Sequence, residues 1–569
     1  MTAINDPVAG VLPPKHSGVA LDDAHIGHIN GAMGTVLHGD VAPRVGWRAR
    51  SRILFTSLGP GLIVMVSDND AGAIGTYAQA GQNCGTTLMW TLLLLIPVLY
   101  GNQEMVVRLG AVASVGHARL ILERFGRFWG AFSVIDLFLL HALTIVTEVI
   151  GVSLALKYPG FSQFWAVLAS TCTIMIAVST GNFPRLERLA VFLAFGSLLL
   201  VPVIVMVHPP VEEMAHDFLV PQFPKGAKLT EVLLLIIAIV GTTVAPWQVF
   251  FQKSYIVDKR IAPRFIRYER WDLVIILMVM IGAVAMMGFC AAIFTGKTEF
   301  GNYTVALGAA LGLEKYAGQL PAILFAMALL EASIIGVAAV GLATPYAIGD
   351  VFSLRHSLHR KPYDARGFGA VYFGLIVIAA VVVMTLGTPL SLLTNAVQTL
   401  ASVLLPSATV FLLLLSNDNA VLGPWVNSSA LNLFTGAVIA LLVVLSIILT
   451  SSVLFRDMGE AVIIGILAGG SALTVLTAIT ALALRRGKSV PKWTGDPALK
   501  WTWRMPLSLF RLASVTLHAT TSLYERDMIP RIGVKAGLSI SGGLERWAAA
   551  LYPCLGHSRH RNRQREAGR

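Results

Sequence analysis

The chain has 569 residues, of which 55% are hydrophobic and only 13% are charged. A soluble domain with a solvated surface does not normally reach these proportions or a mean hydropathy of +0.72, so the composition predicts a polytopic membrane protein. In such a protein the formal net charge of +12 reports topology first, and no nucleic-acid-binding motif accompanies it. Four widely spaced cysteines without a CxxC pair argue against a disulfide framework and against a thiolate zinc site.

Apolar segments of about the length that a membrane span needs recur from residue 54 onward. We expect twelve spans, at residues 54–80, 87–109, 128–157, 163–180, 187–208, 231–255, 271–296, 320–343, 369–387, 391–415, 430–451 and 460–484. Residues 1–50 are polar and lack the apolar core of a signal peptide, so we expect an N-terminal tail.

Lys and Arg fall in alternate loops, as the positive-inside rule requires. The loops expected in the cytoplasm hold most of them: Arg119, Arg124, Arg127, Arg185, Arg188, Lys253, Lys259, Arg260, Arg264, Arg267, Arg270, Arg355, Arg360, Lys361 and Arg366. The intervening loops are poor in both residues and include Lys157, Lys225, Lys228 and Lys297. Twelve spans then place both termini in the cytoplasm, and we predict a prokaryotic inner membrane.

Most of the first span belongs to the stretch GPGLIVMVSDNDAGAIGTYAQAGQNCG, residues 59–85. It places Asp68 and Asp70 in the middle of an apolar segment, where each carboxylate costs about 2.5 to 3.5 kcal/mol on the insertion scale. Gly72 and Gly75 make it easy for the helix to unwind there and to turn carbonyl groups toward a cavity. The stretch therefore predicts an ion site in a discontinuous helix.

The sixth span repeats this organisation, because GTTVAP at 241–246 interrupts two apolar halves. Pro246 lacks an amide hydrogen and Gly241 loosens the same place, so we expect a second break. Interrupted helices in corresponding positions are typical of transporters built from inverted repeats of five spans, with the substrate between the breaks. A simple proline kink remains the alternative for the sixth span taken by itself.

Few other ionisable residues lie within the spans, and each is a functional candidate by default. They include Asp136, His141 and Glu148 in the third span and Glu331 in the eighth. His141 and Glu148 share a helical face and would line a common polar path, although a satisfied buried imidazole is the alternative for His141.

Taken together, these residues resemble the Nramp divalent-metal transporter family, over residues 50 to 455. The family's DPGN metal motif falls on Asp70-Ala71-Gly72-Ala73, and its MPH motif falls on Ala245-Pro246-Trp247. Further agreement lies in QEMVVRLG at 103–110, TEVIG at 147–151, LLEAS at 329–333 and VQTLASVLLP at 397–406. The resemblance implies an all-α leucine-transporter-type fold with inverted 5+5 helix repeats.

The departures from the family pattern concern the metal ligands. Ala245 stands where classical members have a Met, and Ala73 stands where they have an Asn. The Met thioether is a soft ligand that favours transition metals, and this chain lacks it. The family pattern then leaves oxygen ligands: the carboxylates of Asp70 and Asp68 and the carbonyls of Ser67 and Thr242. Such a site suits Mg²⁺, which tends to keep several waters. Gln398, Asn395 and Gln248 are candidates to hold those waters.

Proton coupling is also weakened by comparison with the family. The family's two proton-coupling positions are Ile145 and Trp247 here, and neither side chain titrates. This pattern is similar to the Nramp-related magnesium transporter branch, which moves Mg²⁺ and also Mn²⁺. We therefore expect uptake of divalent cations by alternating access, with Asp70 as the main charge partner, Asp68 second, and Glu148 near the route.

We expect four parts: a tail at 1–50, a transporter core at 51–455, an additional transmembrane helix at 456–486 and a basic, Trp-containing tail at 487–569. The last suits either an anionic lipid surface or a solvated, disordered tail. The expected partners are a divalent metal ion and the bilayer, with no cofactor, no nucleic acid and no assigned oligomeric state. No nucleophile-and-base pair, phosphate loop or zinc motif indicates an enzyme.

Three alternatives stay open from the sequence. A classical carrier would couple Mn²⁺ or Fe²⁺ to protons, although Ala245 and Trp247 argue against it. An amino-acid or organic-cation permease of the same fold would bind an amine at the carboxylate. A membrane-embedded metal sensor would signal through the basic tail.

Overall fold

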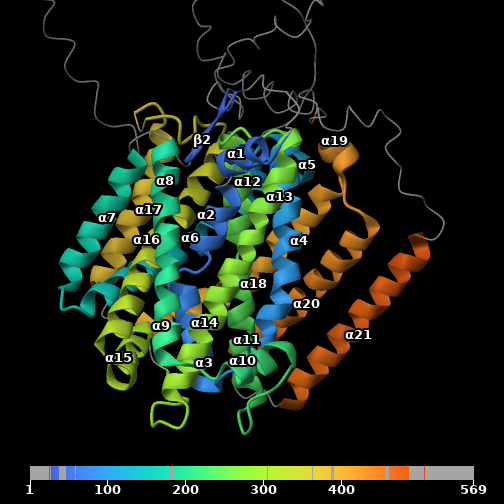
Figure 1. The fold of residues 1–569 in the computed structure, drawn as a ribbon. Helices are drawn as coiled ribbons and strands as arrows, with labels where there is room; N and C mark the ends of the chain where they lie inside the picture. The colour runs from blue at the N-terminus through green and yellow to red at the C-terminus, as the bar shows by residue number, and fades with distance from the viewer. Residues whose placement is uncertain are drawn as a thin grey trace, which may run out of the picture. The chain divides into compact units, whose positions relative to one another are not determined.

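The computed structural model describes residues 25, 27–37, 46–57, 59–179, 183–303, 305–361, 363–385, 390–454, 460–485 and 505. Within these residues the chain is almost wholly helical (Figure 1). The predicted tail at 487–569 lies outside the described residues, except for Met505.

Long apolar helices make up the body of the molecule, and shorter elements connect them. Its strands are β1 Ile29–Gly31 and β2 Gly34–Val36, and its 3₁₀ turns are η2 Phe195–Leu199, η3 Pro263–Phe265, η4 Leu273–Ile275 and η5 Gly423–Trp425. The first helices are α1 Trp47–Ser57, α2 Pro60–Ser67, α3 Ala71–Cys84, α4 Trp90–Ala113, α5 His117–Phe125, α6 Arg127–Lys157, α7 Gln163–Ser179, α8 Phe183–Ala194, α9 Leu200–Val207 and α10 Val211–Leu219. The remaining helices are α11 Leu229–Thr243, α12 Pro246–Asp258, α13 Ile266–Asp272, α14 Ile276–Phe294, α15 Ala306–Ala317, α16 Gln319–Phe352, α17 Arg366–Thr385, α18 Leu390–Ser416, α19 Asn419–Leu422, α20 Ser429–Leu454 and α21 Glu460–Arg485.

The all-α membrane architecture is confirmed, but the number of twelve spans is not. Among the described residues, seven helical segments are long and apolar enough to cross a membrane, or up to nine if each of two bent pairs forms one span. Three shorter apolar helices lie at Gln163–Ile176, Val279–Phe294 and Val462–Thr474. Polar interruptions and bends shorten the continuous apolar stretches, and this separates the observed number from the one expected from hydropathy.

The broken helix α2–α3 lies in the middle of the helical body (Figure 1). The two longest helices, α6 and α16, pack along each other beside it, and α14 packs along α3. Helices α20 and α21 pack together at the edge of the view, outside the other helices. The centre of the core is thus the place where two interrupted helices meet continuous ones.

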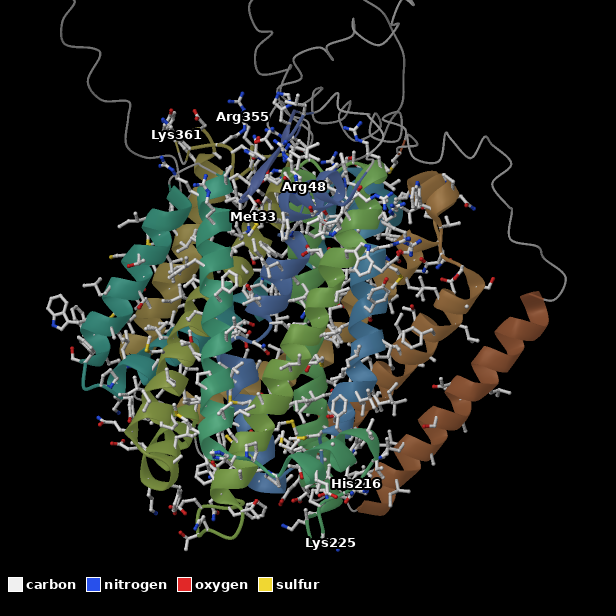
Figure 2. The ribbon with its side chains drawn as sticks, in the orientation of Figure 1. Met33, Arg48, His216, Lys225, Arg355 and Lys361 are labelled. Atoms are coloured by element: carbon white, nitrogen blue, oxygen red, sulfur yellow. The ribbon has the colours of Figure 1, made fainter. Side chains whose placement is uncertain are left out.

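Basic side chains lie at both ends of the helical body. Figure 2 shows Arg48, Arg355 and Lys361 at one end and His216 and Lys225 at the opposite end. This distribution follows the alternation of basic loops in the sequence, since Lys225 belongs to one of the loops expected on the other side of the membrane.

A two-stranded hairpin forms within the segment predicted as a polar tail. Strand β1 pairs antiparallel with β2, with Ile29 opposite Val36. Gly31 approaches α1 so closely that a Cβ there would lie 2.1 Å from the carbonyl oxygen of Thr56. The glycine is therefore required by the close contact between the hairpin and α1.

Candidate metal-binding site

The first break separates α2 from α3 at residues 68–70. Asp70 is the N-cap of α3, and its Oδ1 accepts a hydrogen bond from the amide of Ala73 at 2.8 Å. A short acidic side chain at this position satisfies one of the free amides that every helix start presents. The sequence therefore starts a new helix at the carboxylate instead of continuing the old one.

The break also frees the carbonyl of Ser67. In a continuous helix the amide of Ala71 would donate to this carbonyl, but here it donates to Glu148 Oε2 of α6 at 3.1 Å. Glu148 is fully buried and its Oε1 has no hydrogen-bond partner. Glu148 therefore lies against the first break, and this contact explains how the break is held open. Its predicted place near the transport route stays a prediction.

The second break lies between α11 and α12, and Pro246 is the first residue of α12. Proline has no amide hydrogen, so the carbonyl of Thr242, four residues earlier, loses its helical donor. The Thr242 hydroxyl is buried and also lacks a partner. Ser67 and Thr242, whose carbonyls the family pattern nominated, thus both lose their helical donors at the breaks, and their role as ligands stays a prediction.

Gln248 joins the two breaks. Its Nε2 donates to Asp68 Oδ1 and to the carbonyl of Thr243 at 3.2 Å, while its Oε1 accepts from Gln103 Nε2 of α4 at 2.9 Å. Gln248 thus contacts residues of both breaks, and its role in holding water stays a prediction. Gln103 was missed, although an amide within a predicted span was a usable signal.

Gly336 of α16 makes room for the carboxyl groups. A Cβ at this position would lie 2.5 Å from Glu148 Oε2 and 3.2 Å from the Cβ of Asp70. Ser67 Oγ also reaches α16, donating to the carbonyl of Ile335 at 3.5 Å. The continuous helix α16 therefore forms one wall of the site, a role that the sequence did not indicate.

The carboxyl groups have little compensation. Asp68 and Asp70 are 1% and 5% exposed, and Asp68 Oδ2 has no hydrogen-bond partner. In the described part of the chain, no ion pair joins Asp68, Asp70 or Glu148 to a basic side chain. Buried carboxylates without a countercharge are strongly unfavourable, so the arrangement suits a bound cation or a proton.

Side chains alone do not complete a metal shell. Among the described residues, no three His, Cys, Asp or Glu side chains are arranged to hold a metal ion by themselves. Ala73 and Ala245 are buried and add only methyl groups. Any ion here would take its remaining ligands from carbonyl oxygens, amide oxygens or water, which are the ligands of hard cations.

A hydrogen bond joins α3, the second half of the first broken helix, to α11, the first half of the second broken helix. Tyr77 of α3 and Thr243 of α11 share a hydrogen bond of 2.8 Å, and both are buried. Thr243 in turn donates to the carbonyl of Ile239. The contact holds α3 against α11 beside the Asp68–Gln248 bond.

Other predicted residues lie elsewhere or outside the description. His141 Nδ1 bonds to Thr344 at 2.7 Å, but its Nε2 is buried without a partner, so the imidazole is only half satisfied and the shared path with Glu148 stays a prediction. Asp136 accepts from Ser407 at 2.7 Å. Trp247 is buried with its ring 6.1 Å from that of Phe251.

The remaining predicted residues are Glu331 of α16 and two residues of α18. Both carboxylate oxygens of Glu331 are buried without a partner. Asn395 and Gln398 belong to α18, but their side chains lie outside the described part.

Comparison with known proteins agrees with this geometry. The family described as natural resistance-associated macrophage protein-like matches residues 61–452. A divalent metal cation transporter MntH of Burkholderia ambifaria is 25% identical over 429 residues, covering 70% of this chain and 89% of that protein. A metal transporter Nramp2 of Populus trichocarpa is 23% identical, covering 79% and 84%.

A solved structure extends the likeness to the fold. The crystal structure of the Eremococcus coleocola manganese transporter in complex with an aromatic bis-isothiourea substituted compound matches with a TM-score of 0.59 and 20% identity, covering 78% of this chain and 96% of that one. The helical body therefore has the leucine-transporter-type fold of these transporters, which are not enzymes. With its family match covering both breaks and all the helices around them, the chain belongs to the Nramp family.

Proposed function

We propose that this protein imports Mg²⁺, and also Mn²⁺, across the membrane by alternating access without proton coupling. The ion binds between the α2–α3 and α11–α12 breaks and keeps part of its water shell. Asp70 is its principal charge partner and Asp68 the second.

One observation carries this proposal: the carbonyls of Ser67 and Thr242 lose their helical donors at the two breaks, and buried carboxylate oxygens of Asp68 and Glu148 at the first break have no hydrogen-bond partner. All of these are oxygen ligands, which hard divalent cations prefer. The methyl groups of Ala73 and Ala245 offer no competing soft ligand and leave space for water. Gln248 donates to Asp68, and this contact supports a role for it in orienting such water.

The selectivity and the coupling follow from what the site lacks. Ile145 is fully buried and apolar, and Trp247 has no group that titrates in the physiological range. The relatives with printed functions move manganese or divalent metal cations, which supports a divalent substrate here. Their names do not mention Mg²⁺, so the proposed preference for Mg²⁺ depends on the oxygen ligands of the site.

The position in the membrane is part of the proposal. The end of the molecule that carries Arg48, Arg355 and Lys361 (Figure 2) faces the cytoplasm of a prokaryotic cell by the positive-inside rule. Both termini then lie in the cytoplasm, and the core at 51–455 carries transport. The basic tail at 487–569 rests on anionic lipid.

The direct test is ion uptake by the full chain in proteoliposomes. Mg²⁺, Mn²⁺ and Ca²⁺ are compared with and without a pH gradient, while a trapped dye reports internal pH. We expect Mg²⁺ and Mn²⁺ to enter at rates that a pH gradient leaves unchanged, without acidification of the lumen. Absence of Mg²⁺ uptake in vesicles that take up Mn²⁺ would contradict the oxygen-only argument.

A proton-coupled Mn²⁺ carrier is the second candidate, because the proteins of similar fold include a manganese transporter. It predicts acidification that tracks metal entry. Inhibition of uptake by a primary amine, with no metal entering, would instead indicate an organic-cation permease.

A further inference from the structure

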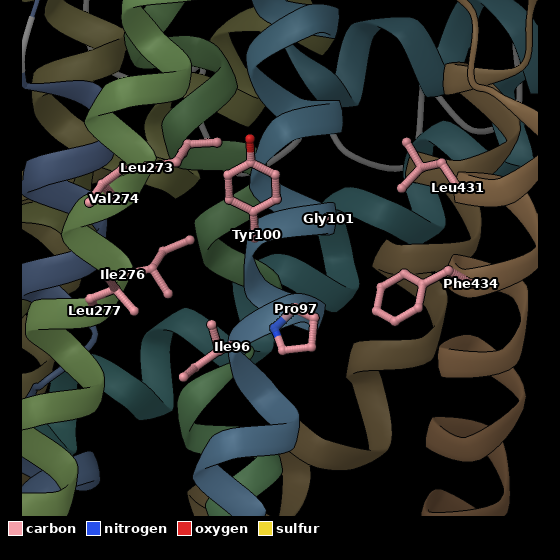
Figure 3. A pocket seen from close by; sticks show the side chains of 10 residues that line it. All are labelled: Ile96, Pro97, Tyr100, Gly101, Leu273, Val274, Ile276, Leu277, Leu431 and Phe434. Carbon is pink, nitrogen blue, oxygen red and sulfur yellow. The ribbon is translucent and has the colours of Figure 1, made fainter.

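An apolar groove of about 470 Å³ lies on the membrane-spanning body, away from the metal site. Figure 3 shows that three segments line it: α4, the η4–α14 segment and α20. Its lining residues are Ile96, Pro97, Tyr100, Gly101, Leu273, Val274, Ile276, Leu277, Leu431 and Phe434. The volume falls in the range of small-molecule sites, about 300 to 1,000 Å³.

The groove exists because α4 is locally thin. Pro97 and Gly101 lie one helical turn apart on the same face, and Gly101 has no side chain to fill the space toward Phe434. A Cβ at Gly101 would lie 3.4 Å from the Phe434 ring. The rim is open to the membrane, since Tyr100, Val274 and Leu277 are 43%, 45% and 47% exposed.

Positive charge lies at one end of the groove. Arg270 is one helical turn before Leu273, and it bonds Glu104 Oε1 through Nε at 3.1 Å and Nη2 at 2.6 Å. Glu104 also accepts from Arg108 Nε at 2.8 Å. The acidic residues of α13, Glu269 and Asp272, are buried, so the charge that this helix presents outward is that of its arginines. Arg267, one helical turn before Arg270 in α13, is exposed.

The two ends of the groove therefore differ in polarity. Arg267 lies about 9 Å along the helix from Leu273, at 1.5 Å per residue. The Tyr100 hydroxyl points toward the same end of the groove (Figure 3). Trp271 on the same helix is 65% exposed, as expected for a ring at the headgroup level.

We infer that this groove binds an acyl chain of an anionic phospholipid, whose phosphate is held by Arg267 and the free Nη1 of Arg270. An arginine has five N–H donors, and the bonds to Glu104 leave Nη1 available. The lipid lies in the leaflet that adjoins the basic loops.

A second copy of the chain fits this surface less well. In a two-fold dimer through the groove, the same patch would face itself. The positive charge around Arg267 and Arg270 would then be opposed by like charge. A phosphate next to an apolar chain complements both features of the surface.

Native mass spectrometry of the full chain in detergent tests the inference, with phosphatidylglycerol or phosphatidylcholine as the added lipid. Leu277→Trp fills the groove from its exposed rim, and Ile281→Trp, one turn along α14 and 59% exposed, is its matched control. Arg267→Gln removes the headgroup contact, and Arg355→Gln, exposed at the same end of the molecule (Figure 2), is the second control.

We expect the natural chain and both controls to retain phosphatidylglycerol, and Leu277→Trp and Arg267→Gln each to retain about tenfold less, which corresponds to about 1.4 kcal/mol. Equal retention by Leu277→Trp and Ile281→Trp overturns the groove as the site. Equal retention of phosphatidylcholine overturns the anionic headgroup. A dimer that excludes lipid and is lost in Leu277→Trp overturns the inference in favour of self-association. Because lipid retention is measured without transport, these outcomes are independent of the proposed function.

Discussion

The two broken helices lose a backbone hydrogen bond at the break for different reasons. In the α2–α3 break, a charged residue from another helix takes the amide that would have closed the turn, because Ala71 donates to Glu148. In the α11–α12 break no other residue is needed, because Pro246 has no amide hydrogen to donate. The α2–α3 break therefore depends on the Glu148 side chain, which can carry a proton or a charge. The α11–α12 break depends only on the covalent structure of Pro246.

The two breaks also differ in the charged side chains that they contribute to the site. The first break contributes Asp68 and Asp70, while the second contributes no charged side chain between Thr242 and Trp247. The charge that attracts a cation thus belongs to α2–α3, and the second break contributes a fixed carbonyl and open space. Changes to the first break should affect binding strongly, and changes to the second should affect selectivity and rate.

The largest effect should come from Asp70→Ala. The substitution removes both the main charge partner and the N-cap of α3, and a cap of this kind contributes about 1 kcal/mol to helix stability. We expect Mg²⁺ uptake in proteoliposomes to fall to the level of protein-free vesicles.

Asp364→Ala, at an exposed loop position, is the control and should transport normally. To separate loss of charge from loss of fold, Asp70→Asn keeps a capping side chain. Normal uptake by either Asp70 variant in correctly inserted protein would contradict the site assignment.

A smaller effect is expected from Pro246→Ala. The alanine amide can donate to the Thr242 carbonyl, and a hydrogen bond of this kind contributes about 1 kcal/mol. Because this bond competes with the ion for the carbonyl, we expect uptake to fall about fivefold. Pro345→Ala, within the continuous helix α16, should leave uptake unchanged, and a similar loss in both variants would mean that the effect is one of general helix distortion.

The breaks were predictable because their causes are local. A buried carboxylate pair, an N-capping Asp and a proline each act within one turn of the chain, so Asp70 and Pro246 stand out in the sequence. The residues that complete the arrangement were not predictable in this way. Gly336 is important only because α16 brings it against Glu148, and Gln103 only because α4 brings it to Gln248.

The span count shows the same limit. Hydropathy located the apolar segments well, with 128–157 predicted where α6 covers Arg127–Lys157. It could not establish which bent or short helices cross the membrane, since that depends on how neighbouring helices cover them. The hairpin β1–β2 was missed because two three-residue strands within a polar segment give no usable periodicity.

The selectivity of the second break can be sharpened with Ala245→Met. A thioether next to the released carbonyl adds a soft ligand, which favours Mn²⁺ over Mg²⁺. We expect the ratio of Mn²⁺ to Mg²⁺ uptake in a competition assay to rise about threefold, which corresponds to less than about 1 kcal/mol. Ala245→Leu has a similar size without sulfur, so an equal shift in both variants would attribute the change to lost space for water.

The smallest effect concerns Gln103, which bridges the two breaks only through Gln248. Removing it in Gln103→Ala leaves Gln248 Oε1 without its partner at 2.9 Å, but Gln248 keeps its bonds to Asp68 and to the Thr243 carbonyl. A lost neutral hydrogen bond contributes about 0.5 to 1.5 kcal/mol, and water entering the space of the side chain offsets part of it. We therefore expect KM for Mg²⁺ to rise about twofold with kcat unchanged. A loss as large as that of Asp70→Ala would mean that Gln103 contacts the ion itself and that the charge of the first break is not the dominant contribution.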